Sequence, residues 1–226
     1  MLDMWLVCVG LCMGSFIGCA VSRKEKILSE GFWEAMDGRS ECDCCGEKLK
    51  WYELIPVVSW VAQGGKCRNC KEKIPARFLM SEVFAGITAL MFSWMDWKYA
   101  VVLMGLYLGA VFDAEWGEVP YWVTDVTLGV ATVGAMRTLG WKGVVSGVVM
   151  YVVLRVLYQL RPGSIGGADV NFMSAMCMYY TIRYIPVLCG LVGGLGLLCL
   201  AITKEKGLRM VPVLWVAYLC MYWISL

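Results

Sequence analysis

Histidine is absent from all 226 residues, and charged residues are scarce. Without an imidazole, the chain cannot form a Ser-His triad, a Cys-His dyad or a Cys₂His₂ metal site. Only 17% of the residues are charged whereas 60% are hydrophobic, which is far from the composition of a soluble domain. The net charge of +2 argues against a nucleic-acid partner, for which a basic face is expected. We therefore expect a membrane protein in contact with a lipid bilayer.

Apolar stretches recur along the chain, with lengths that suit membrane-spanning helices. They cover residues 3–22, 78–95, 99–113, 120–136, 143–160, 170–182, 184–203 and 210–226. The sequence therefore predicts an all-α polytopic membrane protein with about eight transmembrane helices. Three parts are expected: a first helix at 1–22, a polar insertion at 23–77 and a helix bundle at 78–226. Gly10, Gly14 and Gly18 recur every four residues, which predicts that another helix approaches the first one closely.

The distribution of lysine and arginine predicts the orientation, because positively charged short loops stay in the cytoplasm. Eight spans place sixteen of the 20 basic residues on one side, eleven of them in 23–77. The other basic residues on that side lie in the connections 155–169 and 204–209, where they are Arg155, Arg161, Lys204, Lys206 and Arg209. Four basic residues remain for the opposite side: Lys98, Arg137, Lys142 and Arg183. The polar insertion is therefore expected in the cytoplasm.

Two C-x-x-C pairs lie in the polar insertion: Cys42 with Cys45, and Cys67 with Cys70. Two such knuckles supply four thiolates, which complete a tetrahedral zinc site with no open position. A pair of disulfides is the alternative, but the reducing cytoplasm disfavours it. The spacing therefore predicts a small zinc-ribbon-like domain with a structural zinc ion. Cys44 is left as a spare thiol, and the cysteines of the apolar spans are expected to be small buried residues.

Two aspartates lie at the expected cytoplasmic ends of apolar spans: Asp113 in LGAVFDAEWGEVP and Asp169 in GSIGGADVNF. A carboxylate held near hydrocarbon is costly and is usually kept for a function. Two carboxylates that share one proton can act as base and acid in hydrolysis without histidine. The alternatives are a helix cap at Asp169, an ordinary interfacial residue at Asp113, ion binding and proton transport. Glu115 and Glu118 are expected to be solvated.

Four blocks of the chain resemble the type IV prepilin peptidases, which are membrane aspartyl proteases of the GxGD type. The first two blocks are Gly14-Ser15-Phe16 with Arg23, and WYELIPVVSW at 51–60 between the cysteine pairs. CRNCKEKIPARFLMSE at 67–82 is the third, and it contains Arg77 and Glu82. The fourth comprises two aspartate motifs, Asp113 with Pro120 and Asp169 after glycines. Gly18, Ala168 and Asn171 depart from the asparagine, glycine and lysine that are usual in the family.

The resemblance implies that Asp113 and Asp169 are catalytic and that the substrates are prepilin or pseudopilin precursors with a short basic leader. It also implies a multi-pass protein of the bacterial inner membrane, with the active site and the zinc domain in the cytoplasm. The filament would be a type IV pilus, the pseudopilus of a type II secretion system or a DNA-uptake filament. Many members also methylate the new N-terminus with S-adenosylmethionine, so this second activity is expected from resemblance alone. A proton- or ion-coupled transporter and a non-catalytic pilus assembly scaffold are the alternatives.

Overall fold

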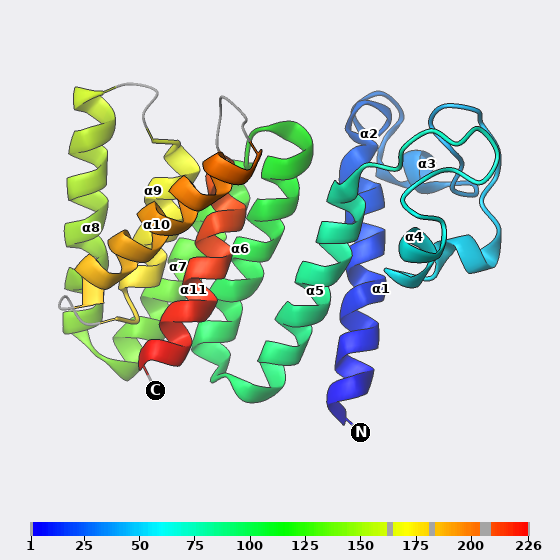
Figure 1. The fold of residues 1–226 in the computed structure, drawn as a ribbon. Helices are drawn as coiled ribbons and strands as arrows, with labels where there is room; N and C mark the ends of the chain where they lie inside the picture. Colours follow the sequence, from blue (N-terminus) through cyan, green and yellow to red (C-terminus); the bar gives the residue numbers. More distant parts are fainter. Residues whose placement is uncertain (1, 162–164, 181–183, 204–208, 226) are drawn as a thin grey trace. The chain divides into compact units, whose positions relative to one another are not determined.

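The computed structural model describes residues 2–161, 165–180, 184–203 and 209–225. These residues form helices and no strand, so the all-α prediction is confirmed. They divide into two compact units, Met1–Trp94 and Met95–Leu226, each of which is described by itself (Figure 1). The expected domain boundaries after residues 22 and 77 stay a prediction. Arg183, Lys204, Lys206 and the last two residues of the stretch 170–182 lie outside the described residues.

The N-terminal unit is built on two antiparallel helices, α1 (Leu2–Ser22) and α5 (Ala76–Trp94), which lie side by side (Figure 1). They pack closely because α1 presents glycines to α5. A Cβ atom on Gly10 would lie 2.5 Å from the Cβ of Ala89, and one on Gly14 would lie 2.7 Å from that of Ala85. At Gly18 it would lie 2.6 Å from the hydroxyl of a serine in α5. The predicted close approach along this glycine face is confirmed.

The segment between α1 and α5 contains only short elements. In chain order these are α2 (Lys24–Glu30), α3 (Phe32–Met36), the 3₁₀ helix η1 (Trp51–Leu54) and α4 (Val58–Ala62). Two isolated antiparallel bridges, Glu41 with Lys48 and Lys66 with Lys73, close the loops that carry the cysteine pairs. Most residues of 37–73 are exposed, so a hydrophobic core cannot order this segment alone. Turns and the cysteine cluster must therefore help to order this segment.

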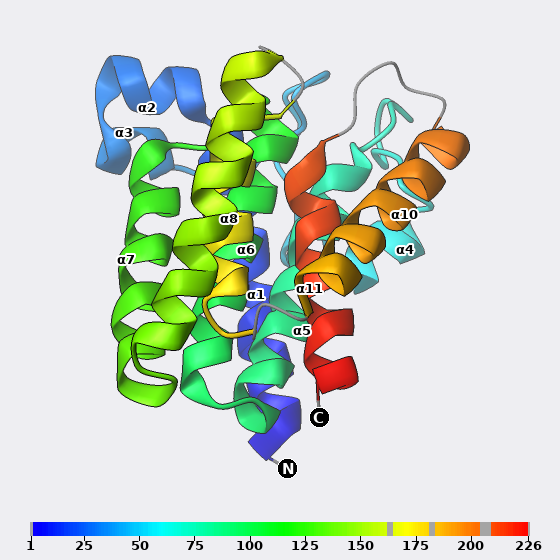
Figure 2. The ribbon, with the colours of Figure 1, turned by 90° about the vertical axis from the view of Figure 1, so that its left-hand side faces the viewer.

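The C-terminal unit is a bundle of six helices (Figure 2). They are α6 (Trp97–Trp116), α7 (Tyr121–Thr138), α8 (Trp141–Leu160), α9 (Gly167–Cys177), α10 (Ile185–Thr203) and α11 (Met210–Ser225). The short helix α9 contacts α6, α7, α8 and α11. Eight of its 11 residues are buried, from Asp169 to Cys177 with the exception of Asn171. It is therefore the core element of the bundle and brings Asp169 inside it.

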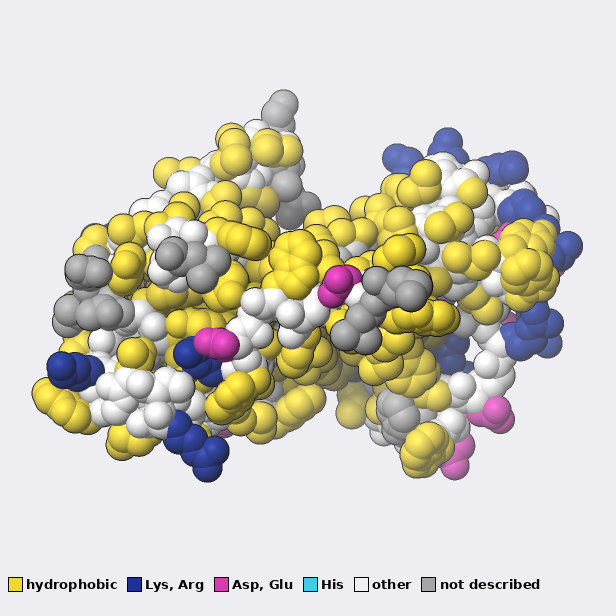
Figure 3. All heavy atoms as spheres, turned by 90° about the horizontal axis from the view of Figure 1, so that it is seen from below, with side chains coloured by type: hydrophobic (Ala, Val, Ile, Leu, Met, Phe, Trp, Pro, Cys, Tyr) yellow, Lys and Arg dark blue, Asp and Glu magenta, His cyan; other side chains and the backbone are white. Residues whose placement is uncertain are grey.

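Helices occupy all eight expected stretches, and five of them are long and apolar enough to cross a membrane. The five are α1 from Asp3, α5, α6, α8 and α10 up to Ile202. The helix α11 is apolar but shorter, with 16 residues, and α7 and α9 are not among the candidates. Large hydrophobic side chains are exposed along these helices, such as Val152 of α8 and Leu197 of α10, as expected for surfaces that meet lipid. Hydrophobic side chains are also frequent on the face seen in Figure 3, which looks at the ends of the helices. The apolar helices thus confirm the prediction that the chain is a membrane protein.

Candidate active site and metal centre

The helices that carry the two aspartates touch at a glycine. A Cβ atom on Gly109 of α6 would lie 2.6 Å from the ring of Phe172 in α9, which is fully buried. Asp113 lies four residues after Gly109, and Asp169 lies three residues before Phe172. Residues three or four apart share one face of a helix, so each aspartate lies on the contact face of its own helix. The two aspartates therefore belong to facing helix surfaces, one turn from the contact.

Asp113 occupies the last turn of α6. Its Oδ2 atom is buried, and within the described residues it has no hydrogen-bond partner. Gly117 ends the helix in a left-handed conformation, with φ of 68°, and its N–H donates to the carbonyl of Asp113. Arg209 donates to the same carbonyl and to that of Ala114. Arg209, which directly precedes α11 and lies 96 residues after Asp113, thus caps α6 and places its positive charge beside the carboxylate.

Asp169 occupies the first turn of α9. Its Oδ2 atom accepts a hydrogen bond from the backbone N–H of Gly166 at 3.0 Å, so the expected capping contact is present. Unlike an ordinary cap at the protein surface, Asp169 is buried, with only 7% of the residue exposed to solvent. Burial raises the pKa of Asp169 to about 6, and the nearby charge of Asp113 acts in the same direction. A carboxyl group with this pKa can hold or release a proton near neutral pH, which a solvated cap cannot do.

Asn171, the residue that departs from the family's lysine, joins α9 to α7. Its amide nitrogen donates to the hydroxyl of Thr124 at 3.1 Å and to a carboxylate oxygen of Asp125 at 3.3 Å. Asp125 is exposed, so its carboxylate remains accessible beside the start of α9. Sequence reasoning had assigned neither Thr124 nor Asp125 to the site. The contact shows that Asn171 fixes the first turn of α9, which carries Asp169.

The four cysteines of the C-x-x-C pairs gather in one cluster in the N-terminal unit. The Sγ atoms of Cys42, Cys45, Cys67 and Cys70 all lie within 4.8 Å of one another, and those of Cys42 and Cys70 are 3.8 Å apart. Tetrahedral zinc with Zn–S bonds of about 2.3 Å places its sulfurs about 3.8 Å apart, so this cluster could hold such an ion. Cys44 is exposed and outside the cluster.

The two cysteine knuckles repeat one set of backbone hydrogen bonds. The first cysteine of each knuckle donates to the carbonyl five residues on: Cys42 to Glu47 at 3.0 Å, and Cys67 to Glu72 at 2.8 Å. A left-handed residue follows each second cysteine, Gly46 with φ of 67° and Lys71 with φ of 62°. The matching sequences CDCCGEK at 42–48 and CRNCKEK at 67–73 carry this repeat. Both knuckles therefore present their thiols from the same local fold.

Backbone N–H groups also point at the thiols. The pKa of Cys67 is lowered to about 7 because the N–H groups of Cys70 and Asn69 donate to its sulfur. The N–H of Glu47 lowers the pKa of Cys45 in the same way. Thiolates, and not thiols, bind metals, so these contacts favour the form that a metal requires. Burial and hydrogen bonds with the neighbouring thiols act in the opposite direction at the other two cysteines: the pKa of Cys42 is raised, and that of Cys70 is raised to about 12. The positions of the four sulfurs, more than their pKa values, suit the cluster to a cation.

The motif WYELIPVVSW is tied to the second knuckle through a buried acid. Glu53 has a side chain that is 4% exposed, and it pairs with Arg68 at 3.4 Å. Its carboxylate also accepts the backbone N–H of Lys50 at 2.7 Å. Arg68 lies between the two cysteines of the second pair and also donates to the hydroxyl of Tyr52. The conformation of η1 thus depends on the knuckle beside it.

A strained turn follows η1 in the same motif. Val57 has φ of 63° and ψ of −52°, and the N–H of Val58 donates to the carbonyl of Pro56 at 2.6 Å, which defines a γ-turn. Positive φ is costly for a β-branched residue. The N–H of Val57 donates to the carboxylate of Glu82 in α5 at 2.6 Å. Glu82 thereby holds the turn, a role that no pattern in the sequence indicates.

The chain is similar in sequence to one protein-family model and to several known proteins. Residues 8–96 match the family model of the bacterial peptidase A24 N-terminal domain. A prepilin leader peptidase/N-methyltransferase of Vibrio cholerae is 38% identical over 44% of this chain, and one of Myxococcus xanthus is 26% identical over 78%. These matches support the type IV prepilin peptidase family.

Coverage of the prepilin peptidase relatives differs from one to the next. The chain spans 41% of the length of the Vibrio relative and 48% of the Myxococcus relative, which is less than two thirds of either. A type 4 prepilin-like proteins leader peptide-processing enzyme of Escherichia coli is 25% identical, with 87% of this chain and 83% of that protein aligned. No solved structure matches the chain. The resemblance inferred from the sequence motifs is confirmed.

Proposed function

We propose that the chain is a membrane-embedded aspartyl endopeptidase that removes the short basic leader from type IV prepilin or pseudopilin precursors. The observation that carries this proposal is the placement of Asp113 and Asp169 on facing surfaces of α6 and α9. The names of the relatives support the substrate class. A precursor of this kind keeps its basic leader in the cytoplasm and its apolar helix in the bilayer. The bond to be cut would then lie at the membrane surface, where the two aspartates are proposed to act.

The two aspartates have different roles in the proposed hydrolysis. One carboxylate accepts a proton from water, which attacks the carbonyl carbon, while the protonated partner donates a hydrogen bond to the carbonyl oxygen and then a proton to the leaving nitrogen. We assign the protonated role to Asp169, because burial raises its pKa to about 6. Asp113 would be the base, with the positive charge of Arg209 nearby. Asn171 would hold the turn that carries Asp169.

We further propose that Cys42, Cys45, Cys67 and Cys70 bind one structural zinc ion. The positions of the four sulfurs fit its coordination. Zinc would hold the two knuckles together in a segment that buries little apolar surface. The N-methyltransferase part of the relatives' names supports a second activity, methylation of the new N-terminal amine with S-adenosylmethionine as donor. An inner-membrane location with the catalytic and zinc sites in the cytoplasm belongs to the same proposal.

Coexpression with a pilin-like precursor tests the endopeptidase. The precursor carries a short basic leader before an apolar helix, and mass spectrometry reports cleavage as the loss of the leader mass. Asp113→Asn and Asp169→Asn should each abolish measurable cleavage, because loss of one general acid or base costs roughly 10²–10⁴-fold. The double variant should be scarcely worse than either single variant, since the two groups act as a unit.

Glu118→Gln is the matched control, because Glu118 is exposed in the loop that follows Asp113. It should retain most of the activity. A transporter or an assembly scaffold predicts that the wild-type chain leaves the precursor uncut. Cleavage by Asp169→Asn at the wild-type rate would exclude the proposed pair of acids.

A further inference from the structure

The motif WYELIPVVSW presents exposed apolar side chains. Val58 is 61% exposed and Val61 is 62% exposed, and the two lie three residues apart on one face of α4. Leu54, at the end of η1, and the next residue, Ile55, are exposed as well. Residues 54–62 include no charged residue. Exposed apolar surface that is concentrated in one short segment marks an interaction surface, so this segment requires a partner.

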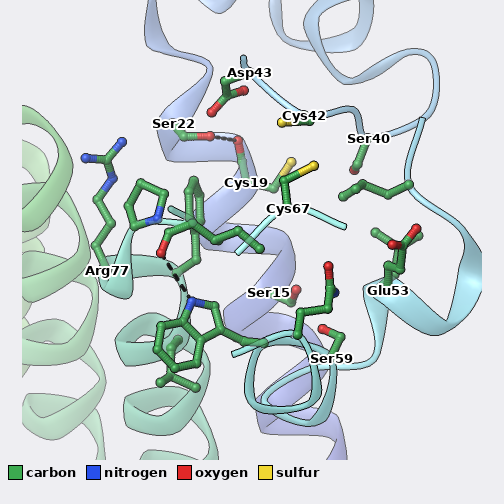
Figure 4. A pocket seen from close by; sticks show the side chains of 18 of the residues that line it. Ser15, Cys19, Ser22, Ser40, Cys42, Asp43, Glu53, Ser59, Cys67 and Arg77 are labelled. Atoms are coloured by element: carbon green, nitrogen blue, oxygen red, sulfur yellow. Dashed lines mark hydrogen bonds between the residues drawn. The ribbon is translucent and has the colours of Figure 1, made fainter. Parts of the chain in front are cut away.

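The polar residue of α4 faces the protein. Ser59 is partly buried and, together with Ser15 of α1, lines the cavity shown in Figure 4. Trp60 is also partly buried, and its indole N–H donates to the carbonyl of Ile74 at 3.4 Å. A helix at a surface in water shows the opposite pattern, with apolar residues toward the protein and polar residues outside. The outer face of α4 therefore suits an apolar environment.

The start of α4 lies beside a membrane-spanning helix and not beyond its end. The N–H of Val57 donates to the carboxylate of Glu82 at 2.6 Å. Glu82 comes six residues after Ala76, where the α5 span begins, so its Cα lies about 9 Å inside that span. On the other helix, a Cβ atom at Gly14 would lie 2.8 Å from this Cα, and Gly14 is well before the end of α1 at Ser22. Figures 1 and 2 accordingly show α4 at a level between the two ends of α1.

This depth reaches the acyl chains of a bilayer. The helix α5 has 19 residues and is about 28 Å long, which matches the roughly 30 Å of the hydrocarbon core. A segment about 9 Å from one end of such a helix lies at the boundary between headgroups and acyl chains or inside it. Helices that lie in a membrane interface are buried to a similar depth, about 5–10 Å.

The backbone around the strained turn needs no water. Lipid offers no partners for peptide groups, so at this depth the protein itself must supply them. Pro56 has no N–H, and the N–H of Val57 is bonded to Glu82. The N–H of Val58 donates to the carbonyl of Pro56, and that of Ser59 donates to the carbonyl of Ile55 at 3.0 Å. The N–H groups from Pro56 to Ser59 are therefore satisfied in a form that tolerates hydrocarbon.

We propose that η1 and α4 insert into one leaflet of the bilayer beside α1 and α5 and contact lipid acyl chains. The contact surface consists of Leu54, Ile55, Val58 and Val61. The occupant is lipid because this surface lies at the depth of the spans α1 and α5 and continues their apolar surfaces. The exposed rings of Trp51 and Tyr52 would lie at headgroup level, where such residues are enriched. One part of the expected polar insertion at 23–77 would then belong to the membrane.

Photocrosslinking in a bilayer tests this proposal. The full-length protein carries p-benzoyl-phenylalanine in place of Val61 and is reconstituted into vesicles of phosphatidylethanolamine and phosphatidylglycerol. After irradiation, mass spectrometry of its peptides should show the mass of a phospholipid added at position 61. The same residue in place of Val58 should give the same adduct, so that one poorly tolerated position does not decide the result. In place of Glu47, which is exposed in the first knuckle, it is the matched control and should give no lipid adduct.

A charge on the same face gives a second measurement. Val61→Asp should make the segment more sensitive to proteolysis in these vesicles, because a carboxylate in hydrocarbon is costly. Val61→Leu keeps the face apolar and should behave as the wild type. If the face met water instead, Val61→Asp would leave the sensitivity unchanged, and this result would overturn the proposal.

The crosslinks also separate lipid from other occupants. A crosslink at position 61 between two copies of the chain would make the face an interface between copies. A crosslink to a pilin-like precursor reconstituted in the same vesicles would make it a docking surface for the substrate. Either result would overturn lipid as the occupant, and so would equal lipid adducts at positions 47 and 61 or the absence of any adduct at both valines. Precursor cleavage is not measured here, so the outcome is independent of the proposed endopeptidase.

Discussion

Gly109 and Phe172 form the contact that sets the distance between α6 and α9. A Cβ atom at Gly109 would lie 2.6 Å from the Phe172 ring and 3.1 Å from the side chain of Val211. Phe172 is fully buried, and a closely packed interior leaves little room for its ring to move without displacing its neighbours. The separation of the helices that carry Asp113 and Asp169 therefore depends on the absence of a side chain at this position.

Gly109→Val should consequently destabilise the bundle and reduce precursor cleavage. Overpacking of this kind costs about 1–3 kcal/mol, and a shift of α9 also displaces Asp169. Gly129→Val in α7 is the control, because a Cβ atom there meets nothing within 4 Å. Thermal unfolding in detergent and the cleavage assay report the two effects. Equal behaviour of the two variants would show that the contact does not control the site.

The metal centre gives a second prediction, on zinc content. We expect about one zinc ion per wild-type chain. Serine at Cys42, Cys45, Cys67 or Cys70 should lower this content, because each substitution removes one of four thiolates. Cys44→Ser should leave the content unchanged, since Cys44 lies outside the cluster. Metal analysis of reduced, freshly purified protein measures both. A loss in Cys44→Ser equal to that in Cys42→Ser would reassign the ligands.

The helices and the metal cluster could be predicted because local features of the sequence determine them. Apolar runs located eight helices of the described residues, and the C-x-x-C spacing identified the four clustered thiols. The stretch 170–182 was expected to be a span, whereas the helix there begins at Gly167 and has 11 residues. Burial by neighbouring helices demands the same apolar residues as burial in lipid, so composition does not distinguish the two.

Contacts between distant residues could not be predicted. Arg209 caps the end of α6 although 96 residues separate it from Asp113, and an arginine in a basic loop carries no sign of its partner. Val57 is a residue that positive φ disfavours, so its turn contradicts local preference. The turn persists because Glu82, 25 residues later, accepts its N–H. Tertiary structure decides these features, and a single sequence does not display it.

The strained turn provides the third prediction. Glu82→Ala removes the acceptor of the Val57 N–H and should destabilise the N-terminal unit by about 1–3 kcal/mol, the cost of a lost bond to a charged group. Val57→Gly relieves the strain and should recover part of this loss. Limited proteolysis of the segment 37–73 measures the effect. Glu72→Ala, at an exposed position, is the control and should not increase cleavage. A Glu82→Ala protein as resistant as wild type would show that the turn does not need this acceptor.

The fourth prediction concerns stability and pH at Asp169. Its pKa in the folded protein is about 6, above the ordinary value of 3.8, so the folded state binds more protons than the unfolded state between these values. The free energy of unfolding therefore falls as pH rises through this interval, and above it the ionised group lowers stability by about 3 kcal/mol at most.

Asp169→Asn removes the ionisation and keeps an oxygen that can accept the N–H of Gly166. This inactive variant should unfold at a higher temperature than the wild type at pH 7 to 8, and the difference should vanish near pH 4. Thermal unfolding in detergent across this range tests the relation, with the exposed Glu118→Gln as the variant that should show no such difference. An Asp169→Asn protein less stable than the wild type at pH 8 would mean that the ionised carboxylate stabilises the first turn of α9, and Asp169 would then be a cap and not the protonated acid.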